Sequence, residues 1–146
     1  MPNTNRTKGH NLERLWAKFW RSIGFKFTRS TRQESTLLDS CGVDLVNIPF
    51  LMQCKSGYAN RYPRYDEEWE YTKFKLLDNF PEGSHFHQQP FLLVHKLDYS
   101  GRSKPYRHYV SMDHITFQTI LKEYYEMNDL LNKNGISYGI TYITHN

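Results

Sequence analysis

Two short stretches, Gly42-Val43-Asp44-Leu45-Val46 and Leu51-Met52-Gln53-Cys54-Lys55, determine the predicted fold. Each is a run of apolar residues interrupted by polar ones, which is typical of a short strand in a folded protein. Because side chains alternate along a strand, Gln53 and Lys55 share one face of the second stretch. The sequence therefore predicts two adjacent strands that bring Asp44 next to Gln53 and Lys55.

A carboxylate, an amide oxygen and an ammonium group are thus expected together at one end of a sheet. Carboxylate and amide oxygens are ligands that hard divalent cations prefer. A cation held there would polarise a phosphate and activate an attacking water. The competing interpretation is that Asp44 and Lys55 form an ordinary cross-strand ion pair, with Gln53 as a polar group at the sheet edge.

Length and composition limit the possibilities further. The chain has 146 residues, of which 38% are hydrophobic and 23% charged, and this predicts one soluble globular domain over 1–146. We find no apolar run of transmembrane length and no secretory signal, so we expect a cytoplasmic protein with no membrane partner. The formal net charge of +4 and the aromatic content of 16% are compatible with a nucleic-acid partner. The two cysteines, Cys41 and Cys54, are expected to be core residues without a disulfide.

Periodicity along the rest of the chain predicts further elements. An amphipathic helix is expected over 11–23, with Glu13 at the border of an apolar stripe formed by Leu12, Leu15, Trp16, Phe19, Trp20 and Ile23. Residues 1–9 are polar and basic and are expected to form a flexible arm ahead of a core over 10–112 and a C-terminal helix and tail over 113–146. The other expected elements are strands over 25–29, 91–95, 106–112 and 136–144, helices over 66–80 and 113–127, and a mobile loop over 30–40. This order predicts an α/β fold with one mixed sheet flanked by helices.

This order of elements, with Glu13, Asp44, Gln53 and Lys55 at their places, resembles the PD-(D/E)xK nuclease superfamily. Residues 8–57 are similar to archaeal-type Holliday junction resolvases, and the matching motifs are Gly9 with Glu13-Arg14, Arg29-Ser30, Asp44 and Lys55-Ser56. The Gln53-Cys54-Lys55 phrase also resembles the Gln-x-Lys motif of Mrr-like restriction endonucleases. Two departures are Val43 in place of proline before Asp44, and Gln53 in place of the acid of (D/E)xK, which removes one negative charge.

The resemblance implies a restriction-endonuclease-like αβββαβ core and a catalytic set of Lys55, Asp44, Gln53 and Glu13. Asp44 would be the principal ligand of Mg²⁺, for which Mn²⁺ is expected to substitute, with the Gln53 amide oxygen and the Cys54 backbone carbonyl beside it. Glu13 would reach the ion directly or through water. Lys55 would orient or activate the attacking water and offset charge on the phosphate.

A second set of residues is expected to contact the nucleic acid. Arginine suits bidentate recognition of phosphate, and interleaved Tyr and Arg over 58–65 can hold phosphates while rings stack on bases. The competing interpretation is that this segment, like the polar stretch after Ser30, is a plain solvent-exposed loop. The expected contact residues are Lys8, Arg14, Arg29, Ser30, Arg32, Ser56, Tyr58, Arg61, Tyr62 and Arg64.

The predicted function is a metal-dependent DNA endonuclease selective for branched DNA, above all four-way junctions. Such an enzyme cuts two strands symmetrically, so a homodimer is expected. The small size is compatible with a phage or mobile element. The alternatives are an Mrr-like restriction or repair endonuclease on duplex DNA, an RNA-directed nuclease, and a non-catalytic DNA-binding module of the same fold. The His85 and His87 pair is only a weak zinc signal, because no cysteine stands at ligand spacing.

Overall fold

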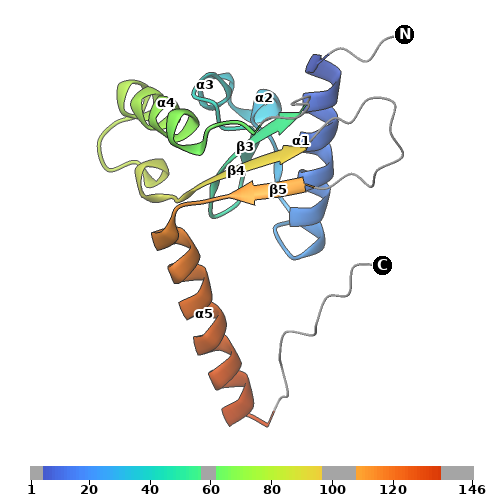
Figure 1. Cartoon of the computed structure of the whole chain (residues 1–146), viewed down its shortest axis with the longest axis vertical. Coiled ribbons are helices and arrows are strands. Elements are labelled where there is room, and N and C mark those ends of the chain that lie inside the picture. The colour runs from blue at the N-terminus through green and yellow to red at the C-terminus, as the bar shows by residue number, and fades with distance from the viewer. Residues whose placement is uncertain (1–4, 57–61, 97–107, 136–146) are drawn as a thin grey trace. The chain divides into compact units, whose positions relative to one another are not determined.

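The computed structural model describes residues 5–56, 62–96 and 108–135 (Figure 1). The chain divides into two compact units, 1–112 and 113–146, which are described separately. The first unit is a mixed α/β structure whose five-stranded sheet is flanked by helices. Among the described residues, no helix is long and apolar enough to cross a membrane.

The strands are ordered in the sheet as they are in the sequence. The pairs β1–β2, β2–β3 and β4–β5 are antiparallel, whereas β3 and β4 are parallel, with Leu51 opposite Phe91 and Lys55 opposite His95. A parallel pair needs a crossover connection, and this one contains the helix α4. The strands are β1 (Arg29–Ser30), β2 (Leu45–Val46), β3 (Leu51–Ser56), β4 (Phe91–Lys96) and β5 (His108–Ser111).

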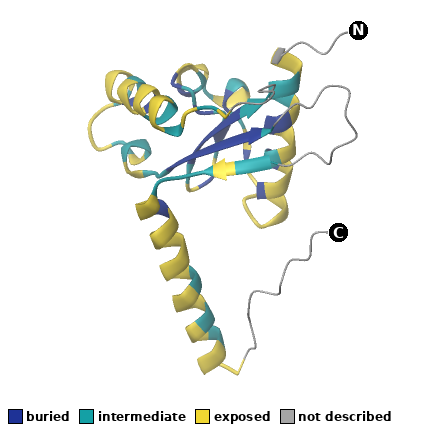
Figure 2. Ribbon diagram, viewed as in Figure 1, coloured by how far each residue is buried: buried dark blue, intermediate teal, exposed yellow. Residues whose placement is uncertain are grey.

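The alternation predicted for the strands is confirmed by the two hydrophobic clusters that cover the sheet. Met52 and Cys54 belong to the cluster formed with α1 (Asn5–Ser22), whereas Leu51 belongs to the cluster formed with α4 (Tyr65–Asn79). The central strands β3 and β4 are almost entirely buried, and Figure 2 shows them as the dark centre of the first unit. Both cysteines are buried and free, as expected.

Helix α1 differs from its prediction in length and in the face that it buries. It begins at Asn5, so the expectation of a flexible arm over 1–9 is wrong for residues 5–9, whereas residues 1–4 lie outside the described chain. Leu15 and Phe19 are 54% and 48% exposed. The buried side chains of the helix are instead Leu12, Glu13, Ala17 and Trp20. The contact face is therefore rotated, and Glu13 lies within it rather than at its border.

The segment between α1 and β2 also differs from its prediction. The expected strand over 25–29 is reduced to β1, and the backbone before it is held by turns in which Thr28 N donates to Phe25 O at 3.1 Å. The expected mobile loop over 30–40 is wrong, because it contains the short helices α2 (Thr31–Glu34) and α3 (Thr36–Ser40). Ser35 Oγ accepts from Leu38 N and caps α3, and Leu38 is buried in the α4-side cluster.

The remaining elements follow the predicted order. Helix α4 carries three acidic residues in its first turn, where the helix dipole favours negative charge, and a short 3-10 helix, η1 (His85–Gln88), precedes β4. In the second unit, α5 (His114–Lys133) is longer than predicted, and Asp113 caps it by accepting from Thr116 N at 2.7 Å. The expected strand over 136–144 lies outside the described residues.

Candidate functional site

The centre of the candidate site is a hydrogen bond between the two stretches that determined the predicted fold. Cys54 N donates to Asp44 Oδ2 at 2.6 Å, and Asp44 N donates to Met52 O at 2.8 Å. Two hydrogen bonds thus fix both the backbone and the carboxylate of Asp44 beside β3. The predicted approach of Asp44 to the strand that carries Gln53 and Lys55 is confirmed.

The charge of Asp44 is sensitive to its surroundings. Burial raises the pKa of Asp44 from 3.8 to about 7, and the negative charges of Glu13 and Asp39 also raise it. The Cys54 N–H donor and the positive charge of Lys55 oppose this shift. Asp44 is therefore a carboxyl group poised between its neutral and charged forms near neutral pH. Burial and the nearby carboxylates also raise the pKa of the Cys54 thiol, which stays protonated and offers no anionic ligand.

Lys55 lies on the α4 side of the sheet and has a partner that the sequence reasoning did not identify. Its Nζ lies 3.5 Å from Glu68 Oε2, and both side chains are about one quarter exposed, at 28% and 24%. Glu68 is followed at intervals of four residues by Thr72 and Leu76, both buried. This spacing on one helix face is the signal that would have placed Glu68 against β3.

Gln53 is 4% exposed and lies on the same side of the sheet as Lys55, against Gly42 and α4. A Cβ added to Gly42 would lie 2.9 Å from Gln53 Nε2 and 3.0 Å from Thr72 Oγ1, so an alanine there would force these side chains to shift. Gly42 also has a φ of +84°, which favours glycine. Within the described structure, Gln53 Oε1 is buried without a hydrogen-bond partner. An amide oxygen in that state is a candidate ligand atom.

Glu13 is 7% exposed and is held by residues of β1 and α2. Arg32 Nη2 donates to Glu13 Oε2 at 2.5 Å, and Ser30 Oγ donates to the same oxygen at 3.3 Å. Arg32 also contacts the ring of His10 through Nη1. Glu13 therefore faces the Asp44 region with its charge already balanced by a guanidinium.

A pocket of about 350 Å³ adjoins the site through Glu13. Arg14, Arg29, Ser30 and Arg32, all predicted as nucleic-acid contacts, line it together. Its wall is completed by His10, Ala17, Arg21 and Gln33. Sequence reasoning missed Arg21 and His10. His10 stands three residues before Glu13 and four before Arg14, and Arg21 stands seven residues after Arg14. These spacings place both residues on the helix face that carries Glu13 and Arg14.

The other predicted contact residues are not brought into this pocket. Ser56 ends β3 opposite Lys96, and Lys8 lies near the start of α1, outside the pocket lining. Arg64 forms ion pairs with Asp66 at 3.1 Å and with Glu67 at 2.9 Å, on the exposed surface at the start of α4. Tyr58 and Arg61 lie outside the described residues.

Tyr62 belongs to an aromatic cluster next to Lys55. Its ring contacts His95 edge-on at a centroid distance of 4.9 Å, and Tyr109 stacks on His95 at 5.2 Å. His95 is 1% exposed, and neither ring nitrogen has a hydrogen-bond partner within the described part of the chain. Burial lowers the pKa of His95, so the imidazole is neutral at neutral pH. His95 and His108 lie on β4 and β5, whereas His85 and His87 lie in η1.

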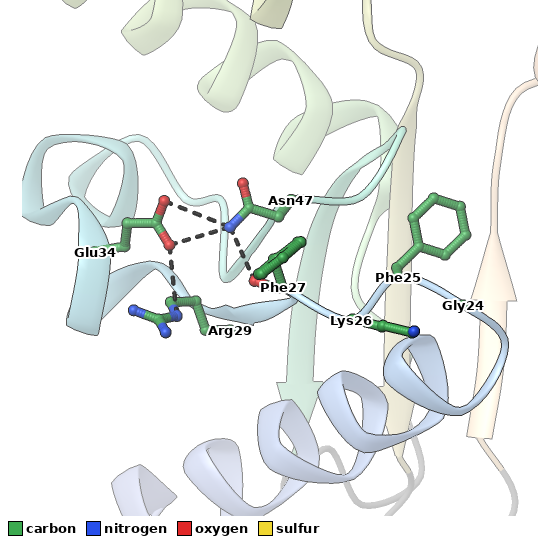
Figure 3. Close-up of a pocket in the computed structure, with 7 residues that line it drawn as sticks. All are labelled: Gly24, Phe25, Lys26, Phe27, Arg29, Glu34 and Asn47. Atoms are coloured by element: carbon green, nitrogen blue, oxygen red, sulfur yellow. Dashed lines mark hydrogen bonds and ion pairs between the residues drawn. The ribbon is translucent and has the colours of Figure 1, made fainter.

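A larger pocket of about 780 Å³ lies between the turn after α1 and Asn47, and of its lining residues only Arg29 also lines the pocket beside Glu13 (Figure 3). Asn47 Nδ2 donates to Phe27 O at 2.9 Å and to Glu34 Oε2 at 3.1 Å, and Glu34 in turn pairs with Arg29 at 3.7 Å. Figure 3 shows that these polar groups already satisfy one another. The pocket contains none of the predicted catalytic or metal-binding residues.

The oxygen atoms of the predicted ligand set fit a hard divalent cation in type. No three His, Cys, Asp or Glu side chains among the described residues are grouped so that they could hold a metal ion. The predicted set, however, has only two such side chains, Glu13 and Asp44, and depends otherwise on an amide and a backbone oxygen. The buried Gln53 Oε1 without a partner and the Asp44 carboxylate are oxygen ligands of the kind that Mg²⁺ prefers. One oxygen of Glu13, Oε2, is already held by Arg32.

Comparisons of the chain with models of protein families, with curated proteins and with solved structures give no match. The functional conclusions below therefore depend on the residues and their geometry.

Proposed function

We propose that this protein is a metal-dependent endonuclease that hydrolyses phosphodiester bonds in DNA, with a PD-(D/E)xK-type core. The observation that carries the proposal is the 2.6 Å hydrogen bond from Cys54 N to Asp44 Oδ2. It holds a carboxylate against the strand on which Gln53 and Lys55 project to one face. Such a group of oxygen donors and an ammonium at one end of a sheet supports a phosphodiester hydrolase.

In the proposed mechanism, the ionised Asp44 carboxylate and the Gln53 amide oxygen would hold Mg²⁺, with Glu13 and the Cys54 carbonyl as further donors. The ion would supply Lewis-acid stabilisation of the phosphate. Lys55 orients the attacking water and offsets negative charge on the phosphate. Glu68, 3.5 Å from Lys55 Nζ, acts as a positioning residue for the ammonium, whose positive charge lowers the pKa of Asp44.

The proposed substrate is branched DNA, with the four-way junction as the preferred form, and the proposed active species is a homodimer. The support for this choice is the similarity of residues 8–57 to archaeal-type Holliday junction resolvases. Arg14, Arg29 and Arg32, which are part of that region, line one pocket beside Glu13. Arginine guanidinium groups suit the phosphates of a DNA backbone.

The test compares cleavage of a four-way junction with cleavage of linear duplexes of matched sequence, in Mg²⁺ and in Mn²⁺. Lys55→Ala is the site variant, and Lys73→Ala, an exposed lysine on α4, is the matched control. We expect paired symmetric nicks on the junction, abolished by Lys55→Ala and retained by Lys73→Ala. Equal cutting of both substrates would reject junction selectivity and favour an Mrr-like enzyme. Cleavage that survives Lys55→Ala would reject the assigned site.

Three features favour a second candidate, a DNA-binding module of the same fold that does not cut. Gln53 stands in place of an acid. Glu13 is already paired with Arg32, and Lys55 is already paired with Glu68. Each of these weakens a metal site or a catalytic lysine. Titration calorimetry with Mn²⁺ distinguishes the two candidates, because the nuclease binds metal and loses that binding in Asp44→Ala, whereas the module binds DNA without binding metal.

A further inference from the structure

Helix α5 carries an apolar stripe that the proposed cleavage chemistry does not use. We call it the α5 stripe, and its members recur at alternating steps of three and four residues: Phe117, Ile120, Tyr124, Met127 and Leu131. This spacing is the one by which two helices pack along each other, since each helix then presents the same face over successive turns. Phe117, Ile120 and Met127 are 51%, 37% and 54% exposed. We propose that two copies of this chain pair through the α5 stripe, with α5 of one copy against α5 of the other.

The polar half of α5 supports a protein as the partner rather than DNA or a membrane surface. The helix has two lysines, three acidic residues and no arginine, so it is slightly acidic. Both lysines are already paired, because Lys122 Nζ lies 3.9 Å from Glu126 Oε1 and Lys133 Nζ lies 2.9 Å from Asp129 Oδ2. A DNA backbone or an anionic membrane would need an excess of positive charge on this helix. The α5 stripe therefore fits another apolar surface.

The residues beside the α5 stripe favour a second copy in the parallel orientation. Glu123 and Asn128 flank the stripe on opposite sides, five residues apart. In a parallel pair, one flank of each helix lies against the opposite flank of the other, offset by about five residues. The Glu123 carboxylate of one copy would thus accept a hydrogen bond from the Asn128 amide of the other. In an antiparallel pair equal flanks meet, and because Glu123 lies at the middle of α5, the two Glu123 carboxylates would repel each other.

The length of α5 fits a reversible pair. The helix has 20 residues and is about 30 Å long at about 1.5 Å per residue. A single helix of this length is only marginally stable in water, and burial of its apolar face against a partner stabilises it. We therefore expect a dimer whose population rises with protein concentration. The inference rests on the proposed function for the expectation of a homodimer, and it adds the surface through which the two copies meet.

The experiment measures the mass of the full chain by sedimentation equilibrium over a concentration series, in EDTA and without DNA. The stripe variant is Ile120→Asp. The control is Gln118→Asp, which introduces the same charge two residues earlier, on the polar half of α5. We expect the unmodified protein and Gln118→Asp to dimerise alike. The dissociation constant of Ile120→Asp should be at least about a hundredfold higher, because two like charges would meet in an apolar contact.

A second measurement keeps the test valid if Ile120→Asp weakens α5 itself. Cys41 and Cys54 are buried, so a cysteine introduced on α5 is the accessible thiol. In a parallel pair, position 120 of one copy faces position 120 of the other. Ile120→Cys should therefore form a disulfide-linked dimer with oxidised glutathione as the oxidant. Lys122→Cys, on the polar half, is the matched control and should remain unlinked.

The outcomes separate this inference from the proposed function. A monomeric unmodified protein would overturn the inference, and so would Ile120→Asp that dimerises like Gln118→Asp. Failure of Ile120→Cys to link, or equal linking by Lys122→Cys, would overturn it as well. None of these results depends on cleavage. A protein that pairs through α5 and cuts no DNA would reject the proposed nuclease and support this inference, whereas an active nuclease without this pairing would do the opposite.

Discussion

Replacing Asp44 by Asn is expected to stabilise the metal-free protein at alkaline pH. The carboxyl group is buried beside Glu13, and its pKa is raised to about 7. Asparagine has nearly the same shape and carries no charge, and its Oδ1 can still accept the hydrogen bond from Cys54 N. The substitution therefore removes an unfavourable buried charge and retains the contact that holds β2 to β3.

The magnitude follows from the difference between the folded and unfolded pKa values. The folded pKa of about 7 exceeds the ordinary aspartate value of 3.8, so the folded protein binds this proton more tightly than the unfolded chain does. Stability is therefore lost as the pH rises from 3.8 to about 7, and the full loss is present above it. At about 1.4 kcal/mol for each pH unit, the full loss is about 4 kcal/mol. Relaxation of the protein and of nearby water around the buried charge reduces this to about 2–4 kcal/mol.

The assay is urea unfolding in EDTA at about pH 5 and about pH 8, where the Asp44 carboxyl is mainly neutral and mainly ionised. We expect the free energy of unfolding of Asp44→Asn to exceed that of the unmodified protein by about 2–4 kcal/mol at the higher pH and by much less at the lower pH. Asp78→Asn, an exposed residue of α4, is the control and should give the same difference at both values. A gain for Asp44→Asn that is absent at pH 8, or equally large at pH 5, would refute the reasoning.

Three further substitutions test other features of the site. Burial lowers the pKa of His95 below 6.5, so this imidazole should make the unmodified protein lose stability as the pH falls below that value. In unfolding measurements over a pH series, His95→Phe should remove the contribution of His95 to this loss. At neutral pH, the same substitution should raise the free energy of unfolding by about 1 kcal/mol. Gly42→Ala should cost about 2–4 kcal/mol because a clash adds to the positive φ, whereas Gly83→Ala, with a φ of +86° and open space, should cost only about 1–2 kcal/mol in the same melts. Gln53→Glu should bind Mn²⁺ more tightly in calorimetry and lower the melting temperature without metal, since it buries a further carboxylate; unchanged affinity would argue against Gln53 as a ligand.

The sequence was sufficient to predict the centre of the sheet. Strands β3 and β4 have strong apolar patterns, and the alternation in β3 predicted which side chains share a face. The structure then packs one of these faces against α1 and the other against α4. The meeting of Asp44 with Cys54 followed from the short spacing between the two strands. These features depend on local periodicity, which a single sequence displays well.

The features that were missed depend on contacts between distant residues. The apolar stripe of α1 is wider than its contact with the sheet, so the pattern did not reveal that Phe19 would be exposed and Ala17 buried. Helices α2 and α3 have four and five residues and are polar, too short for a helical period to appear. The Arg32–Glu13 ion pair joins residues of different elements and leaves no pattern in the sequence. For the Lys55–Glu68 pair, the spacing of Glu68 with Thr72 and Leu76 indicates a face of α4 but does not name Lys55 as the partner.

The hydrogen bond between Cys54 and Asp44 has a consequence for spectroscopy. The Cys54 amide proton points at the Asp44 carboxylate, which is the principal ligand of the proposed metal site. A bond to a charged acceptor is shorter and stronger than one to a neutral acceptor, and the amide resonance moves with it. In a ¹⁵N-labelled sample, this single cross-peak should therefore report the ionisation of Asp44 and the arrival of a metal, without any substrate or activity assay.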